Sequence, residues 1–400
     1  MKQKSQITML MIVGLVLFII VSLVLYLSKS AAKKQSLPNI KRVQETSVDA
    51  SSMKEFVSKC LDKLAKDAIV LLGKQGGYIY TSQGGPLVDY QATDEGLFFV
   101  KYNNLNVAYN ILQPRFAVPP YSSEIPDYPW TTFPYRTAAS NAEIFEGFFG
   151  MSNIPPLNSS EGPNSIQTQL EAFIDSNMKS CANPDIFKSQ GLEITIGKAK
   201  TSVTIEASDI TVKLEIPIKI TNTATNEIME LKDFSTVLDV GIRDAHSFIK
   251  ELIQNDIKNT KFNISGSKNY KVPASIKIVK DIFSNDDMII VTDENLLVYG
   301  RPFEYIFARK NRAPALYYIK KNTLEFSQGY EIKKEDLLKS YELKAEDPDE
   351  DSLAFSFYIG ESGKNQATFP KKLEVLQLKF RVEVSDGKLS DHQVVIVNRK

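Results

Sequence analysis

The sequence predicts a single transmembrane helix, then an α+β body, then an all-β sandwich. Three observations predict this order. An uncharged apolar run lies near the N-terminus, helical periodicity and strand-like alternation share the middle of the chain, and only short alternating strands follow. We therefore divide the chain into a transmembrane helix at 1–30, a polar stalk at 31–52, an α+β domain at 53–310 and a sandwich at 311–400.

The apolar run extends from Ile7 to Leu27 and contains no charge. About 20 residues at ~1.5 Å per residue match the ~30 Å hydrocarbon core of a bilayer, so the run is predicted to span the membrane, with the lipid bilayer as its partner. Two alternatives stay open. Small residues at 28–32 fit cleavage of a signal peptide, although the run is longer than the usual apolar region of one. The Lys4-Ser5-Gln6 triplet resembles the processing site of archaeal type IV pilin precursors.

Two features disagree about whether the folded body lies in the cytoplasm or outside the cell. More Lys and Arg follow the apolar run than precede it, including Lys41 and Arg42, and the positive-inside rule alone would place the body in the cytoplasm. Long domains, however, translocate largely regardless of such charges. Because the features below favour the outside, we expect an extracellular body held at the cell membrane by a single span.

Composition indicates a folded body without net charge. The 48 basic residues equal the 48 acidic residues in number, so no net positive field attracts nucleic acid, and no nucleic-acid partner is expected. With 43% hydrophobic and 24% charged residues, the chain is typical of globular rather than disordered proteins.

The middle region mixes two periodicities. Apolar residues at helical spacing predict helices at about 53–71, 165–180 and 240–259. The clearest strand covers Ile210 to Ile220, where apolar and polar residues alternate as in a sheet with one buried face. Pro217 lacks an amide donor, so this strand is expected either at a sheet edge or bulged at the proline. We predict helices packed on one face of an antiparallel sheet.

The chain has two cysteines, Cys60 and Cys181, and each falls on the apolar stripe of a predicted helix. Both side chains therefore point inward and meet if the two helices pack together. A disulfide between them would close a loop of about 120 residues, to which the chain-entropy model assigns roughly 4–5 kcal/mol. Two separate buried thiols are the alternative, because free cysteine is often buried. An even count in a membrane-tethered chain favours the bridge, outside the cell.

From Asn311 onward the strand patterns continue without helical periodicity. Phe355 and Phe357 alternate with polar residues, and so do the apolar residues from Leu376 to Val384. Ser385-Asp386-Gly387-Lys388 predicts a hairpin turn, since Asp-Gly supplies the positive φ angles that such turns require. Several short strands in a segment of this length predict a small β-sandwich.

This C-terminal segment resembles a known class of modules through four stretches, which are NRAPAL, FSQGYEI, AEDPDEDSLAFSF and FRVEVSDGKLSDHQVVIV. In this order they are similar to the cadherin-like and dystroglycan-type immunoglobulin-like modules of microbial surface proteins. The resemblance implies a seven-stranded Greek-key sandwich that serves as a spacer or adhesive module, with a protein or glycan as its partner. The whole layout also resembles uncharacterised archaeal proteins anchored by a single span.

Calcium is the one cofactor that the resemblance suggests. Asp347 and Asp349 stand where cadherin modules have an acidic pair, and carboxylates are suitable calcium ligands. Against this, the linker Arg309-Lys310-Asn311-Arg312 is basic where calcium-bridged cadherin linkers are acidic. The alternative is a solvated acidic turn whose side chains accept hydrogen bonds from local backbone amides. Asp286 and Asp287 are likewise expected to be solvated charges beside a hairpin.

Two positions match the acceptor pattern for N-glycosylation. Asn158 and Asn263 each begin an Asn-X-Ser triplet, which fits external loops of an extracellular body.

We expect a non-enzymatic cell-envelope or surface protein that presents an interaction or spacer module. No spacing of carboxylates singles out an acid/base pair, and the two histidines, His246 and His392, fall in different predicted domains. A pilin-like or secretion-apparatus subunit, with the apolar helix packed in a filament, is the first alternative. The second is a hydrolase of envelope polymer with a carboxylate cleft in the α+β domain.

Overall fold

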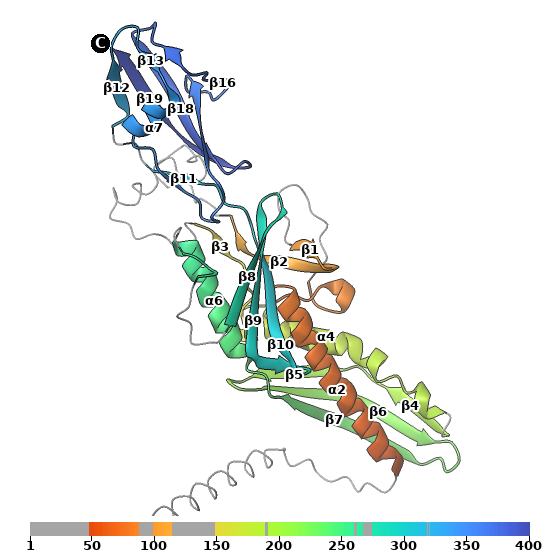
Figure 1. Cartoon of the computed structure of the whole chain (residues 1–400). Coiled ribbons are helices and arrows are strands. Elements are labelled where there is room, and N and C mark those ends of the chain that lie inside the picture. The colour runs from red at the N-terminus through yellow and green to blue at the C-terminus, as the bar shows by residue number, and fades with distance from the viewer. Residues whose placement is uncertain are drawn as a thin grey trace, which may run out of the picture. The chain divides into compact units, whose positions relative to one another are not determined.

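The computed structural model (Figure 1) describes residues 48–87, 99–113, 149–188, 191–259, 262–266, 274–317, 319 and 321–400. Residues 54–400 form one compact unit. The predicted span from Ile7 to Leu27 and most of the predicted stalk lie outside the described residues. Within the described ranges, none of the helices has the length and apolar character needed to cross a membrane.

The chain is rich in β-structure with a few helices. The described α-helices are α2 (Val48–Lys74), α4 (Ile166–Cys181), α5 (Asp185–Lys188), α6 (Ile242–Lys258) and α7 (Lys334–Ser340). The three helices predicted from the apolar periodicity correspond to α2, α4 and α6, and α2 begins earlier than its apolar stripe. Ser165 caps α4 by accepting a hydrogen bond from the Thr168 amide, so this helix begins where its capping residue lies.

The first sheet follows the order β1-β2-β10-β9-β8, with β3 paired to β2. Its strands are β1 (Phe99–Tyr102), β2 (Leu105–Leu112), β3 (Met151–Ser152), β8 (Ala274–Phe283), β9 (Asp286–Val298) and β10 (Arg301–Arg309). The strands pair antiparallel except for β2 and β10, which are parallel. The prediction of an antiparallel sheet is therefore wrong for this pair. A parallel pairing is possible because β2 and β10 are far apart in the sequence and no hairpin joins them.

A second sheet contains the strand that the sequence predicts best. Its members are β4 (Leu192–Ile196), β5 (Lys200–Ile205), β6 (Ile210–Asn222) and β7 (Ile228–Leu238). Strand β6 is central, with β7 along one side and β4 and β5 in succession along the other. Of the two expectations for Pro217, the edge position is wrong and the bulge is confirmed, since the β6–β7 register shifts between Glu215 and Ile218.

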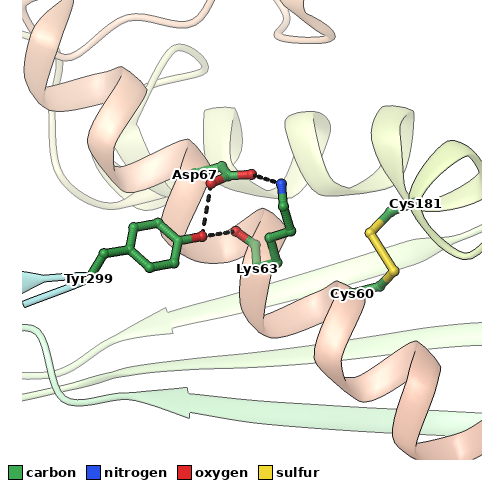
Figure 2. Close-up of a disulfide and its surroundings, with 5 residues drawn as sticks. All are labelled: Cys60, Lys63, Asp67, Cys181 and Tyr299. Carbon is green, nitrogen blue, oxygen red and sulfur yellow. Dashed lines mark hydrogen bonds and ion pairs between the residues drawn. A yellow bond between two sulfur atoms is a disulfide. The ribbon is translucent and has the colours of Figure 1, made fainter.

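Helices α2 and α4 are joined covalently. The structure links Cys60 of α2 to Cys181 of α4 in a disulfide, which is the pairing that the sequence favoured (Figure 2). On another side of α2, the hydroxyl of Tyr299 donates to Asp67 Oδ1 at 2.8 Å and lies 3.1 Å from the Lys63 carbonyl oxygen. Tyr299 lies in the turn between β9 and β10, so α2 is held both to α4 and to the first sheet.

Gly73, near the end of α2, allows close approach to β10. A Cβ atom at this position would lie 2.6 Å from the Phe303 ring and would overlap the Glu304 carbonyl oxygen. We therefore expect Gly73→Ala to lower the free energy of unfolding by about 1–3 kcal/mol, because helix and strand must separate. Urea denaturation checks this, with Lys59→Ala on the exposed side of α2 as a control that changes stability by no more than about 0.5 kcal/mol. An alanine variant as stable as the control would contradict this packing.

The C-terminal residues form a separate set of sheets around their own core. A five-stranded sheet has the order β12-β19-β18-β15-β16, and two short pairs, β13-β17 and β11-β14, complete the set. Their bounds are β11 (Ala315–Leu316), β12 (Thr323–Phe326), β13 (Glu331–Ile332), β14 (Ala345–Glu346), β15 (Ala354–Ile359), β16 (Asn365–Gln366), β17 (Lys371–Lys372), β18 (Gln377–Ser385) and β19 (Ser390–Arg399). Ile332, Leu337, Phe357 and Phe380 share one buried cluster, so β13 and α7 pack on the five-stranded sheet.

Two details of this C-terminal part differ from the sequence prediction or refine it. Helix α7 is present where only strands were expected, because a single helix of seven residues gives too short a periodic pattern to recognise. Strands β18 and β19 form the predicted hairpin, with Gly387 at φ 96° in its turn.

Candidate functional site: a buried arginine–aspartate cluster

The segment that leads from β10 into the C-terminal strands carries two buried arginines. Arg309 is 3% exposed and Arg312 is fully buried. Three aspartates surround them, each 1% exposed, and each comes from a different part of the chain. Asp256 lies on α6, Asp287 on β9, and Asp349 in the loop after β14. We call these five residues the arginine–aspartate cluster.

Arg309 contacts all three carboxylates. Its Nη1 lies 3.0 Å from Asp256 Oδ1 and its Nη2 lies 2.6 Å from Asp287 Oδ2. Its Nε lies 3.0 Å from Asp349 Oδ1. A guanidinium offers donors in a planar fork, which allows one side chain to meet carboxylates from three directions. Arg309 therefore links α6, β9 and the Asp349 loop through a single charged group.

Arg312 bonds to the same loop through both its guanidinium and its backbone amide. Its Nε and Nη2 donate to Asp349 Oδ1 at 3.0 and 2.7 Å, and its backbone amide donates to Asp349 Oδ2 at 2.6 Å. The guanidinium also donates to the carbonyl oxygens of Phe149 at 2.8 Å and Pro348 at 2.9 Å, and lies 2.9 Å from Asp256 Oδ2. Burial alone would raise the pKa of Asp349, but Arg312 and Arg309 beside it hold that pKa below its usual value.

Lys280 completes the charge balance of the cluster. Its Nζ lies 3.1 Å from Asp287 Oδ2, 3.5 Å from Asp351 Oδ1, and donates to the Asp349 carbonyl oxygen. With Lys280, three cations (Arg309, Arg312 and Lys280) face the three buried carboxylates. A buried charge without a partner costs several kcal/mol, so this near-neutral composition is what makes burial of the cluster tolerable.

A second group of contacts lies beside the cluster. Asp286 accepts hydrogen bonds from the Tyr109 hydroxyl at 2.5 Å and the Asn311 amide at 2.8 Å, and pairs with Lys310 at 3.2 Å. The Lys310 ammonium also lies 4.0 Å from the centre of the Tyr109 ring. All four residues of the segment 309–312 are thus engaged by groups from the first sheet, from α6 or from the C-terminal part.

The β18–β19 hairpin also contacts this region. Asn311 Nδ2 donates to Asp386 Oδ2 at 2.9 Å, and Asn285 Nδ2 donates to the Asp386 carbonyl oxygen at 3.2 Å. Asp386 lies in the predicted hairpin turn. The C-terminal part is therefore attached to the first sheet at two places, the Asp349 loop and the tip of this hairpin.

The structure separates the two aspartates considered for calcium. Asp349 is occupied by the two arginines, whereas Asp347 Oδ1 accepts the backbone amides of Asp349 at 2.8 Å and Asp351 at 3.1 Å. The local backbone bonding expected of an acidic turn is thus confirmed for Asp347, although the turn is not solvated, since Asp347 is only 8% exposed. Among the described residues, no group of three or more His, Cys, Asp or Glu is arranged to hold a metal ion.

Asp286 and Asp287 contradict their predicted role. They were expected to be solvated turn charges, but both are buried and paired with cations. A signal for the cluster exists at Asp256, which follows Ile249 and Leu252 at helical spacing and so lies on the apolar stripe of α6. A carboxylate on a buried stripe requires a cation, but the sequence does not say that two arginines more than 50 residues later supply it.

Asp347 makes the stability near the cluster depend on pH. Burial, and next the charge of Asp349, raise the pKa of Asp347 to about 7, against about 3.9 for aspartate in an unfolded chain. The native state therefore holds this proton more tightly than the unfolded state does. The resulting stabilisation is fully present below about pH 4 and is lost as the pH rises through about 7.

We expect Asp347→Asn to remove this pH dependence. The amide keeps an oxygen that accepts the two backbone hydrogen bonds and cannot ionise. The substitution should raise the free energy of unfolding more at pH 8 than at pH 5, by about 1 kcal/mol or more, as measured by urea denaturation at both values. Equal effects of the substitution at pH 5 and pH 8 would show that Asp347 titrates as an ordinary carboxylate.

The two glycosylation triplets differ in their surroundings. Asn263 is exposed, and its Oδ1 accepts hydrogen bonds from the Ser265 hydroxyl at 2.8 Å and the Gly266 amide at 2.7 Å. Asn158 is half-buried, and its Nδ2 donates to Glu161 Oε1 at 2.9 Å. The amide nitrogen that would carry a glycan is thus engaged by a carboxylate at Asn158.

Comparison with known proteins identifies no family. No family model matches the chain, and no curated protein matches it. Among solved structures, a variant of an endo-fucoidan hydrolase from glycoside hydrolase family 107 is similar at 10% identity and a TM-score of 0.13, over 52% of this chain and 41% of that one. The hydrolase itself gives 8% identity and a TM-score of 0.11, over 52% and 38%. This chain spans about two fifths of their length, and likenesses this weak support no conclusion about function.

Proposed function

We propose that the chain is a non-enzymatic, single-pass membrane protein of the cell surface. The segment from Ile7 to Leu27 anchors it, and the body faces the exterior. The C-terminal residues 311–400 form an immunoglobulin-like module that serves for interaction or as a spacer. The arginine–aspartate cluster is the observation that carries this proposal, because it joins that module to the rest of the body.

The cluster has the character of a joint rather than of a reactive centre. Its three buried carboxylates are all paired with cations of the same chain. Buried ion pairs of this kind seldom add net stability, and their best-attested use is to fix one arrangement among several. A fixed arrangement would orient such a module at the cell surface, whereas a flexible linker would let residues 311–400 point in many directions.

In this proposal the basic linker at residues 309–312 replaces the calcium ions of cadherin linkers. In the cadherin modules that the C-terminal segment resembles, calcium ions between acidic linkers hold successive modules together. Here Arg309 and Arg312 occupy the linker and meet carboxylates from both sides. The two guanidinium groups thus supply the positive charge that calcium would otherwise bring, and orientation of the module would not depend on calcium.

The disulfide supports an external location. Disulfides persist in oxidising compartments and are rare in the reducing cytosol. The bond between Cys60 and Cys181 closes a loop of 121 residues in sequence separation, so it constrains most of the first half of the body. Such a bond favours a body on the outer side of the membrane over the orientation that the Lys and Arg count near the span would give.

Protease shaving of intact cells tests the proposed location. Cells that make the full chain are treated with trypsin, and the released peptides are identified by mass spectrometry. We expect peptides from residues 311–400 to be released from intact cells, with a cytosolic protein monitored to show that the cells did not lyse. Full protection of these peptides in intact cells, together with their release after permeabilisation, would place the body inside and overturn the proposal.

A further inference from the structure

The two edge strands of the second sheet differ in whether side chains engage their free main-chain hydrogen-bonding groups. At the β5 edge, helix α4 occupies the main-chain groups of Val203, since Gln167 Nε2 donates to the Val203 carbonyl oxygen and the Val203 amide donates to Glu171 Oε1, both at 2.9 Å. Arg243 of α6 donates to the carbonyl oxygen of Ile205. Side chains from two helices therefore use up hydrogen-bonding groups that would otherwise pair with another strand.

Strand β7 forms the opposite edge and lacks such protection in the part of the chain that the structure describes. It pairs with β6 from Ile228 to Leu238 except at Lys232, where the bulge lies, and no described strand pairs with its other side. Figure 1 shows β7 as the outer member of the sheet. Two of its apolar side chains are strongly exposed, Ile228 at 59% and Val237 at 62%. A long edge strand with exposed apolar residues is a template for pairing with another strand.

The bulge of β6 at Pro217 determines which side chains of β7 share a face. Leu231 lies opposite Ile218 and Phe234 lies opposite Leu214, so both belong to the inner face despite their odd spacing. Lys232 and Asp233, between them, are both exposed. Ile228 and Val237 consequently lie on the same outer face of the strand, on either side of the bulge.

We propose that β7 pairs antiparallel with β7 of a second copy of this chain. In the register that centres on the bulge, Lys232 faces Asp233 of the second copy, and the same contact occurs again by symmetry. Ile228 then faces Val237 of the second copy, so both exposed apolar residues of the strand become covered. Opposite charges and apolar pairs directly across an antiparallel pair are each stabilising.

Neighbouring registers are less favourable. A shift by one residue in one direction places Lys232 opposite itself, and a shift in the other direction places Asp233 opposite itself. Like charges directly opposite each other destabilise strand pairing. This self-complementarity favours a second copy over an unrelated strand, and a two-fold axis closes the pair without leaving another open edge at β7.

Cysteine crosslinking in membranes tests this pairing on the full chain. The two native cysteines are already joined to each other, so introduced thiols are the only free ones. We expect the double variant Ile228→Cys with Val237→Cys to give a covalent dimer on mild oxidation, visible by non-reducing electrophoresis. The two positions lie far apart within one strand, so the bond forms only between copies.

A matched variant controls for random collision. Ile228→Cys with Ser235→Cys places the second thiol on the same face but two residues away from the facing position, and at least a fivefold lower yield of dimer is expected. Equal yields from the two double variants, or no dimer from either, would overturn the proposed register and the pairing with it. Crosslinking to a different protein instead of a second copy would also overturn it.

Discussion

Replacing Arg312 with alanine is expected to lower the free energy of unfolding by about 3–5 kcal/mol. The substitution leaves Asp349 and Asp256 buried with fewer cations, and it removes the donors to the carbonyl oxygens of Phe149 and Pro348. An uncompensated buried carboxylate costs more than the original pair contributed, which explains the large expected effect. Denaturation in urea, followed by fluorescence or circular dichroism, measures it.

Two companion variants separate charge from geometry. Arg301→Ala removes an exposed arginine at the start of β10 and is expected to change stability by no more than about 0.5 kcal/mol. Arg312→Lys keeps the charge, but an ammonium cannot reach Asp349 and the two carbonyl oxygens at once, so most of the loss should remain. A loss for Arg312→Ala no larger than for Arg301→Ala would show that the cluster does not hold the two parts together.

Removing the disulfide is expected to have the second large effect. For the 121-residue separation of Cys60 and Cys181, the chain-entropy model gives a loss of about 4–5 kcal/mol. The variant with both cysteines replaced by alanine should therefore unfold at much lower urea concentration than the natural chain. The same loss should follow reduction of the natural chain by dithiothreitol.

The reduced chain and the alanine variant serve as controls for each other. Dithiothreitol should not alter the stability of the alanine variant, which has no disulfide to reduce. A natural chain whose unfolding midpoint is unchanged by the reductant would contradict the bond between α2 and α4.

Much of the fold is predictable from local patterns. The apolar stripe from Ile166 to Met178 predicts α4 almost to the residue, and in the structure Ser165 caps its start. Strict alternation predicts β6, and Asp386-Gly387 predicts the turn between β18 and β19. These features depend on residues within a few positions of one another, so their physical cause is contained in a short window of sequence.

The arginine–aspartate cluster, in contrast, cannot be predicted from any short stretch of the sequence. The contacts of Arg309 and Arg312 join residues separated by 22 to 163 positions. Asp287 and Asp349 resemble ordinary charged turn residues in sequence, and only the packing of α6, β9 and the Asp349 loop around the linker reveals their burial. The parallel pairing of β2 with β10, which places Arg309 beside Ile111, is equally a long-range event.

The distance between a site in the first sheet and a site in the C-terminal part tests most directly whether the arginine–aspartate cluster holds the two parts rigidly. Spin labels are attached to cysteines introduced at Arg301 and at the exposed Leu376, and pulsed electron paramagnetic resonance is recorded with the labelled chain diluted in unlabelled chain. We predict one narrow distance distribution that is the same with calcium and with a chelator, and that broadens in the Arg312→Ala variant. A broad distribution in the natural chain, or one that narrows only when calcium is added, would contradict a joint held by arginine.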